Sequence, residues 1–220
     1  MSYLALEHDK QLFFGTSLDG VIGYGIVDDV AVVNGDPVCA PSDFPVLLAE
    51  FKSFCKNNGY SVVFLYITDA FLQKYWDAGF AYVKAGEKAR FDLLTYTLKG
   101  NRAGKVRASV NHAAKTCSVF EYRPLVMRDD STERQIAAVS ADWFKGKRTE
   151  KLVFSVGTTS LDEPMDRRYF CARDSSGSIC AFTVFIPFTT QEGRGYMADV
   201  TRRIHDAPGG IADYLNALYR

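Results

Sequence analysis

An aspartate and an arginine near the end of the chain have types and spacing that could do chemistry together. Asp199 and Arg202 stand three residues apart, where a strand predicted over 196–200 ends. Ligands of open α/β sheets bind at strand ends, and a carboxylate beside a guanidinium can orient a charged substrate or move a proton. Taken alone, an Asp-x-x-Arg pair is more often a surface salt bridge, so both interpretations stay open.

A second charged group precedes another predicted strand. Glu150 opens the segment EKLVFSVG and follows the basic residues Lys145, Lys147 and Arg148. The pattern alone favours a charged loop between a helix and a strand.

A basic helix is predicted in the middle of the chain, where Asn101 can cap a helix over 102–115. Small and aliphatic side chains fall on one arc of this helix, and polar ones fill the remainder. The polar face includes Arg102, Lys105, Arg107, His112 and Lys115. A solvated helix surface is the simplest explanation of such a face.

The distribution of charge gives this helix more weight. The formal net charge is zero, yet residues 1–77 hold ten acidic and four basic side chains, a net of −6. Residues 84–115 hold eight basic and two acidic side chains, a net of +6. A polyanion or an anionic surface therefore fits the middle of the chain, although the total charge argues against tight nonspecific nucleic-acid binding.

Composition sets the broad class. A chain of 220 residues is long enough for one large or two small domains with a real core. The sequence has no apolar run of the roughly 18 residues typical of a membrane span, and its first residues do not resemble a signal peptide. Five cysteines without a C-x-x-C pair predict reduced, buried thiols in a cytoplasmic compartment.

The elements that must position these residues fall into two α/β halves. In the first half, strands are predicted over 11–14, 21–27, 30–33, 61–66, 80–84 and 89–93, and helices over 44–54 and 71–76. The apolar run 61–66 is expected to be buried on both faces. In the second half, strands are predicted over 118–123, 169–173, 179–185 and 196–200, and helices over 131–144 and from Pro208 onward.

These halves predict three segments: a first unit at 1–94, a connecting basic helix at 95–116 and a second unit at 117–220. The second unit lacks the strands that should follow its last helix if it repeats the first. Because soluble proteins avoid bare apolar sheet edges, we expect a fragment of a longer protein or a strand supplied from elsewhere.

Six segments, in order along nearly the whole chain, resemble one known family. They are YLALEHDKQLFF, VAVVNGDPV, YTLKGNRAGKVRASVNHAAK, EKLVFSVG, GSICAFTVFIP and MADVTRRIHDAPGGIADYL. The family is the catalytic domain of bacterial phosphatidylglycerol lysyltransferases, also called lysylphosphatidylglycerol synthases or multiple peptide resistance factors.

The resemblance implies an α/β (α+β) fold of tandem GNAT-like acyltransferase units joined by a basic helix, with the second unit truncated. It also implies an enzyme that moves lysine or alanine from aminoacyl-tRNA to the glycerol hydroxyl of phosphatidylglycerol. Full-length relatives carry transmembrane helices, so the expected location is the cytoplasmic face of the bacterial inner membrane.

The family's motifs also imply roles for residues. Asp199 would hold the ammonium of the amino acid or accept the attacking proton, and Arg202 would meet a phosphate or an oxyanion. Glu150 would bind the aminoacyl ammonium. The basic residues expected to contact tRNA or lipid phosphate are Arg102, Lys105, Arg107, His112, Lys115, Lys147 and Arg148.

Two other functions stay open. An acyl-CoA-dependent GNAT enzyme needs a loop that binds the CoA pyrophosphate. The segment 191–195 is one residue too short for that loop motif and is better interpreted as a hairpin turn, and the segment 208–210 lacks the flanking residues of the motif. A noncatalytic GNAT-like module would have the same sequence features. The three histidines are not spaced as ligands, and there is no G-x-S-x-G segment, so we expect no metal, no cofactor and no covalent intermediate.

Overall fold

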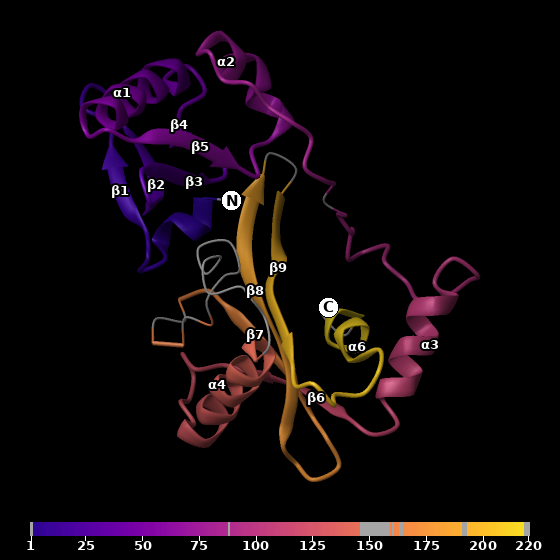
Figure 1. Cartoon of the computed structure of the whole chain (residues 1–220). Coiled ribbons are helices and arrows are strands. Elements are labelled where there is room, and N and C mark those ends of the chain that lie inside the picture. Colours follow the sequence, from indigo (N-terminus) through magenta and orange to yellow (C-terminus); the bar gives the residue numbers. More distant parts are fainter. Residues whose placement is uncertain are drawn as a thin grey trace. The chain divides into compact units, whose positions relative to one another are not determined.

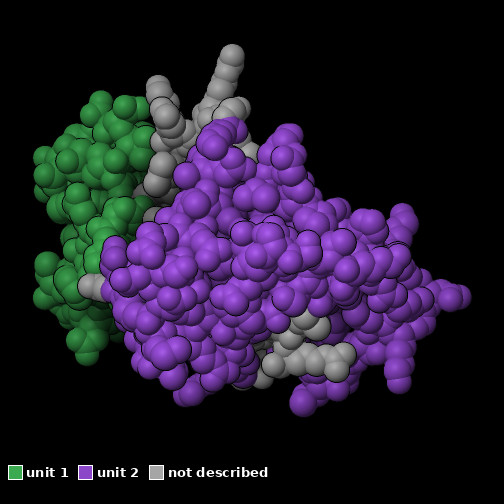
Figure 2. Space-filling model, turned by 90° about the horizontal axis from the view of Figure 1, so that it is seen from below, with its two compact units in different colours: residues 1–88 green, residues 89–220 purple. Residues whose placement is uncertain are grey.

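The structure is a computed structural model that describes residues 2–87, 89–145, 159, 161–162, 165–190 and 193–217. The chain divides into two compact units, residues 1–88 and residues 89–220 (Figure 2). Each unit contains its own sheet, so the protein is a mixed α+β structure. Within the described residues no helix is long and apolar enough to cross a bilayer.

The first sheet opens with an antiparallel meander, as the sequence predicted. A 3-10 turn, η1 (Ser2–Leu6), precedes β1 (Gln11–Phe14), β2 (Gly20–Val27), β3 (Val30–Asn34) and the short β4 (Val38–Cys39). The β2–β3 turn uses Asp28 at a φ of 52°, a left-handed conformation that aspartate tolerates better than most residues. β4 pairs with β2.

A helical crossover completes this sheet. α1 (Phe44–Asn57) starts with a proline at its second position and ends before Gly59, whose φ is 75°. β5 (Ser61–Leu65) then pairs in parallel with β3. Leu47, Phe51 and other apolar side chains of α1 pack on the sheet. The chain continues through η2 (Asp69–Phe71) and α2 (Leu72–Asp77).

Three predictions for the first unit were wrong. β5 is the last strand of its sheet and Val63 is 38% exposed, so the strand is not buried on both faces. The predicted strands at 80–84 and 89–93 are not strands in the described chain, and Val83 is 86% exposed. An alternating apolar pattern forms a strand only where a neighbouring strand accepts its backbone hydrogen bonds.

The second sheet is antiparallel throughout, in the order β6-β7-β8-β9 (Figure 1). The elements of this unit are α3 (Gly104–Ala113), β6 (Ser118–Tyr122), α4 (Asp130–Phe144), β7 (Arg168–Arg173), β8 (Ile179–Thr190), β9 (Gly193–Arg203) and α6 (Ile211–Ala217). β8 and β9 pair in antiparallel fashion from Thr190 and Gly193 onward, so 193–195 belong to a strand and not to the predicted turn, and residues 191–192 lie outside the described residues.

Helices cover both faces of this sheet. Because side chains alternate along a strand, Phe182 and Val184 of β8 pack with Ile136 of α4, whereas Ala181 and Phe185 pack on the α6 side. All five cysteines lie in described parts of the chain and are free thiols, and four are buried, as expected.

The basic helix differs from its prediction. α3 begins at Gly104, two residues late, because the chain at Asn101 forms a turn in which the Asn101 carbonyl accepts from Gly104 N–H. No side chain among the described residues caps α3. Its backbone at Ser109 lies against Gly210, just before α6, so the structure groups the helix with the second unit.

The tandem arrangement stays a prediction. The first sheet has a parallel pair, β3 with β5, whereas the described second sheet is antiparallel, so the two strand orders do not match. The boundaries at 94 and 116 and the joining role of the helix likewise stay predictions. Helical spacing in the sequence places Ile136 and Ala138 of α4 inward, but only Ile136 is buried and Ala138 is exposed.

Candidate functional site

β9 carries the Asp–Arg pair and contains a β-bulge at the aspartate. β8 pairs Val184 with Val200 and Phe185 with Ala198, so Asp199 is the extra residue of the bulge. Bulges redirect side chains and are over-represented next to active sites. β9 runs to Arg203, so Asp199 and Arg202 both lie within the strand. The predicted strand end at Val200 was therefore wrong.

Arg202 is buried under the carboxyl-terminal end of α4. Arg202 is only 5% exposed, and its Nη1 donates a hydrogen bond to Ser140 Oγ at 3.0 Å. Its guanidinium carbon lies 4.6 Å from the ring centre of Phe144 and 5.5 Å from that of Trp143. These distances are typical of cation–π contacts.

Electrostatics connect the two members of the pair. Burial lowers the pKa of Arg202 below its ordinary value, and the negative charge of Asp199 acts in the opposite direction. An arginine nonetheless stays protonated in proteins, so a fixed positive charge lies near Asp199. Asp199 is itself partly exposed. A partly exposed carboxylate near a fixed positive charge can bind an ammonium group or accept a proton.

The sequence did not reveal this setting of Arg202. Arg202 is not at an open strand end, because Val200 and Arg202 both face α4, as alternate residues of one strand do. Helical spacing placed Trp143 inward, but no motif indicated that its ring, that of Phe144 and the Ser140 hydroxyl would meet an arginine from β9.

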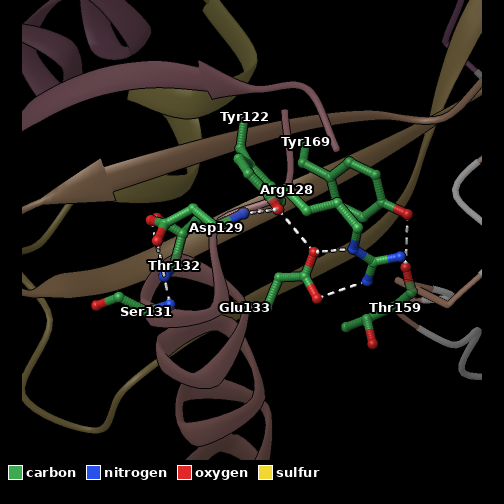
Figure 3. A network of polar contacts seen from close by, with 8 residues as sticks. All are labelled: Tyr122, Arg128, Asp129, Ser131, Thr132, Glu133, Thr159 and Tyr169. Carbon is green, nitrogen blue, oxygen red and sulfur yellow. Dashed lines mark hydrogen bonds and ion pairs between the residues drawn. The ribbon is translucent and has the colours of Figure 1, made fainter. Parts of the chain in front are cut away.

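A polar network fixes the beginning of α4 (Figure 3). The Asp129 carboxylate caps the helix by accepting from the backbone N–H groups of Ser131, at 3.2 Å, and Thr132, at 3.1 Å. The Thr132 hydroxyl also donates to this carboxylate, and that bond is the main reason why the pKa of Asp129 is lowered.

The same network joins α4 to β6. The Tyr122 hydroxyl accepts from Asp129 N–H at 3.0 Å and donates to Glu133 at 2.6 Å. Arg128 donates to both carboxylate oxygens of Glu133, at 2.9 and 2.6 Å, and this pairing lowers the pKa of Glu133. Figure 3 also shows the Tyr169 hydroxyl donating to the Thr159 carbonyl, at 2.9 Å. The network orients the helix whose other end covers Arg202, and sequence analysis missed it.

Four of the five polar residues predicted on the basic helix are exposed: Arg102, Lys105, His112 and Lys115. Arg107 is different, because its Nη1 donates to the carbonyls of Leu98 and Gly100. It also lines a shallow pocket formed with residues 97–101. Arg107 therefore holds the segment that leads into α3.

The remaining predicted site residues cannot be placed. Glu150, Lys147 and Arg148 lie outside the described residues. Lys145, which precedes them, is exposed and pairs with Asp142 at 3.0 Å. The structure thus brings together Asp199, Arg202 and the end of α4.

Fold and site define a two-unit α+β protein with a charged pair on a bulged strand. The family described as "Phosphatidylglycerol lysyltransferase, C-terminal" matches residues 1–218, and the chain belongs to this family. Among relatives, a phosphatidylglycerol lysyltransferase of Staphylococcus epidermidis is 30% identical over 99% of the chain. One of Bacillus subtilis is 29% identical over 98% of the chain.

Solved structures agree with this assignment. The structure of L-PGS from Bacillus licheniformis has a TM-score of 0.81 and 27% identity, covering 98% of this chain and 65% of that one. A structure described as the C-terminal domain of a lysylphosphatidylglycerol synthetase from Agrobacterium fabrum has a TM-score of 0.78 and 26% identity, covering 98% of this chain and 66% of that one. The chain spans about a quarter of the length of these curated relatives, 26% of the Staphylococcus epidermidis protein and 24% of the Bacillus subtilis protein.

Proposed function

We propose that this chain is the catalytic part of an aminoacyltransferase that moves lysine or alanine from aminoacyl-tRNA to the glycerol hydroxyl of phosphatidylglycerol. The observation that carries the proposal is the family match over residues 1–218, together with relatives named for lysyl transfer to this lipid. The tandem GNAT-like arrangement, a membrane-spanning region in a longer parent and the cytoplasmic face of the inner membrane belong to the same proposal.

In this proposal Asp199 is the group that contacts the reactants. The glycerol hydroxyl oxygen attacks the ester carbonyl of the donor, the bond to the ribose oxygen of tRNA breaks, and the hydroxyl proton passes to the departing tRNA. Asp199 either accepts this proton in transit or holds the ammonium of the amino acid. Because the donor ester is already activated, orientation and charge supply most of the catalysis.

Arg202 acts through Asp199. Its burial beneath Trp143 and Phe144 favours a positioning role over direct contact with a phosphate or an oxyanion. Glu150 is proposed to bind the aminoacyl ammonium. Phosphates of tRNA or lipid are proposed to meet Lys147, Arg148 and the exposed basic residues of α3 and its flanks.

A comparison of donors tests the proposal. The protein that contains this chain should bind lysyl-tRNA or alanyl-tRNA in a salt-dependent manner and should form aminoacyl-phosphatidylglycerol. Binding of acetyl-CoA without binding of aminoacyl-tRNA would instead identify an acyl-CoA-dependent enzyme.

A further inference from the structure

A pocket in the first unit gathers three of the four basic side chains present in residues 1–77. Lys52 and Lys56 come from α1 and Lys74 from α2, whereas the same stretch holds ten acidic residues. The pocket has a volume of about 760 Å³, within the usual range of small-molecule sites. Convergence of scarce basic groups in an acidic unit indicates an anionic ligand.

Two of these ammonium groups are held in place. Lys52 donates to the Ala78 carbonyl and lies 5.0 Å from the ring centre of Phe80. Lys74 donates to the Pro41 carbonyl and lies 5.6 Å from the ring centre of Phe71. Each ammonium has three donors, so donors remain for a ligand, and a fixed side chain loses little entropy when the ligand binds.

Carboxylates do not neutralise the three lysines. The fourth basic residue, Lys10, pairs with Glu7 and Asp9. In contrast, none of the three pocket lysines has an ion pair with a carboxylate among the described residues. Asp77 is the acidic residue in the pocket lining and accepts from Gln73 at 2.8 Å. Three lysines against one aspartate leave the lining with a charge of +2.

Exposed apolar side chains neighbour the lining residues along the chain. Val46 follows the lining residue Pro45 and is 48% exposed. Trp76 precedes the lining residue Asp77 and is 61% exposed. Tyr82 is 51% exposed, and its ring meets that of Trp76 edge-on at 6.3 Å. Exposed tryptophan and tyrosine beside lysine are typical of surfaces at a bilayer interface, where one part of the side chain is apolar and the other is hydrated.

We propose that this pocket binds the phosphodiester headgroup of an anionic phospholipid and docks the first unit on a bilayer. The lysines meet the phosphate, and the aromatic side chains enter the interface between headgroups and acyl chains. The pocket shares no residue with the pair formed by Asp199 and Arg202. The proposal rests on the proposed function only in that the acceptor is a membrane lipid.

Sedimentation with vesicles tests the pocket. The chain should bind vesicles of equimolar phosphatidylglycerol and phosphatidylcholine and should bind pure phosphatidylcholine weakly. Lys56 is exposed and its ammonium has no hydrogen bond to the described residues, so Lys56→Glu should fold normally. Each basic residue near an anionic bilayer contributes about fivefold to binding, so this charge reversal should weaken binding about tenfold or more. Lys74→Gln is a second variant, with an expected decrease of about fivefold.

Arg134→Glu is the matched control, because it reverses an exposed charge on α4 of the second unit. This change should alter vesicle binding by about twofold at most. Unchanged vesicle binding by both pocket variants would overturn the proposal. A decrease confined to tRNA binding would also overturn it, because the lysines would then serve a nucleic acid. Full competition by soluble glycerol phosphate would likewise overturn it, because the ligand would then be a free phosphate.

A separate assay distinguishes this proposal from the proposed function. Transfer to a short-chain, dispersed phosphatidylglycerol by the unaltered protein requires no bilayer. Failure of that transfer would count against the proposed function, whereas the vesicle experiment would still decide the role of the pocket.

Discussion

The guanidinium carbon of Arg202 lies 4.6 Å from the ring centre of Phe144, so the last residue of α4 covers a charged group of β9. Ser140, one turn earlier on the same helix, accepts a hydrogen bond from this arginine. A buried cation that stacks on one side chain and donates to another links the helix to the strand. Arg202 therefore contributes to the packing of the second unit and also supplies the positive charge beside Asp199.

Replacement of Arg202 should destabilise the second unit. Arg202→Ala removes the bond to Ser140, the aromatic contacts and the packing of the side chain, so the free energy of unfolding should fall by about 2–4 kcal/mol. Urea titration followed by circular dichroism measures this change. Arg203→Ala, at the exposed neighbour, should cost less than about 0.5 kcal/mol. Equal stability of the two variants would contradict the structural role of Arg202.

Asp199 should matter for transfer more than for folding. Asp199→Asn keeps the shape of the side chain but removes its charge, and it should lower aminoacyl transfer about tenfold to a thousandfold. The rate of lysyl-phosphatidylglycerol formation and the melting temperature should be measured on the same preparation. Full transfer with a much lower melting temperature would show that the pair is a structural salt bridge.

The exposed basic residues of α3 and its flank should control tRNA affinity. Charge reversal of Arg102 and Lys105 should weaken tRNA binding, and the slope of log affinity against log salt should become shallower by about 0.7–0.9 for each phosphate that the protein no longer neutralises. Filter binding at several salt concentrations measures this slope. Arg107→Glu should instead loosen the segment at 97–101, because its guanidinium holds two carbonyls there. An unchanged salt slope in the double variant would remove α3 from the tRNA interface.

The network at the beginning of α4 should make stability sensitive to acid. The hydrogen bonds from Arg128 lower the folded-state pKa of Glu133, so the contribution of this carboxylate is complete above its ordinary pKa of about 4.3. It is lost as the pH falls through the lower, folded-state value. Glu133→Gln should therefore lower the melting temperature at neutral pH and flatten its fall between about pH 5 and pH 3.

A neighbouring carboxylate provides the comparison for Glu133. Asp130 is exposed at the first position of the same helix, and Asp130→Asn should leave most of the acid sensitivity in place. An equal reduction of acid sensitivity in both variants would show that the network around Glu133 is not its source.

Replacement of Gly210 should destabilise the protein, whereas replacement of its neighbour Gly209 should not. Gly210 has a φ of 82°, and a Cβ there would lie 2.6 Å from the Ser109 carbonyl oxygen of α3. Gly210→Ala should therefore cost about 1–3 kcal/mol of unfolding free energy. Gly209→Ala is the matched control, since a Cβ at that position meets no atom within 4 Å. Similar unfolding curves for the two variants would contradict the close approach of α3 to the segment before α6.

The sequence by itself determined the local elements whose signals are short in range. Turn residues at Asp28-Asp29 and alternating apolar residues gave the meander β1–β2–β3, and helical spacing gave α1 and α4 within a few residues. Six ordered segments also gave the family, which the comparisons confirm.

Tertiary structure decided which patterns have partners. The segment 80–84 is mostly apolar, as in a buried strand, but has no strand beside it in the described chain. In contrast, β9 extends past Val200 because β8 pairs with it as far as Arg203. The bulge at Asp199 and the burial of Arg202 depend on that pairing and on the end of α4. Lys52, Lys56 and Lys74 likewise line one pocket only because α1 and α2 pack together beside β5. Local propensity depends on neighbours in the chain, but strand pairing and burial depend on residues that only folding brings together.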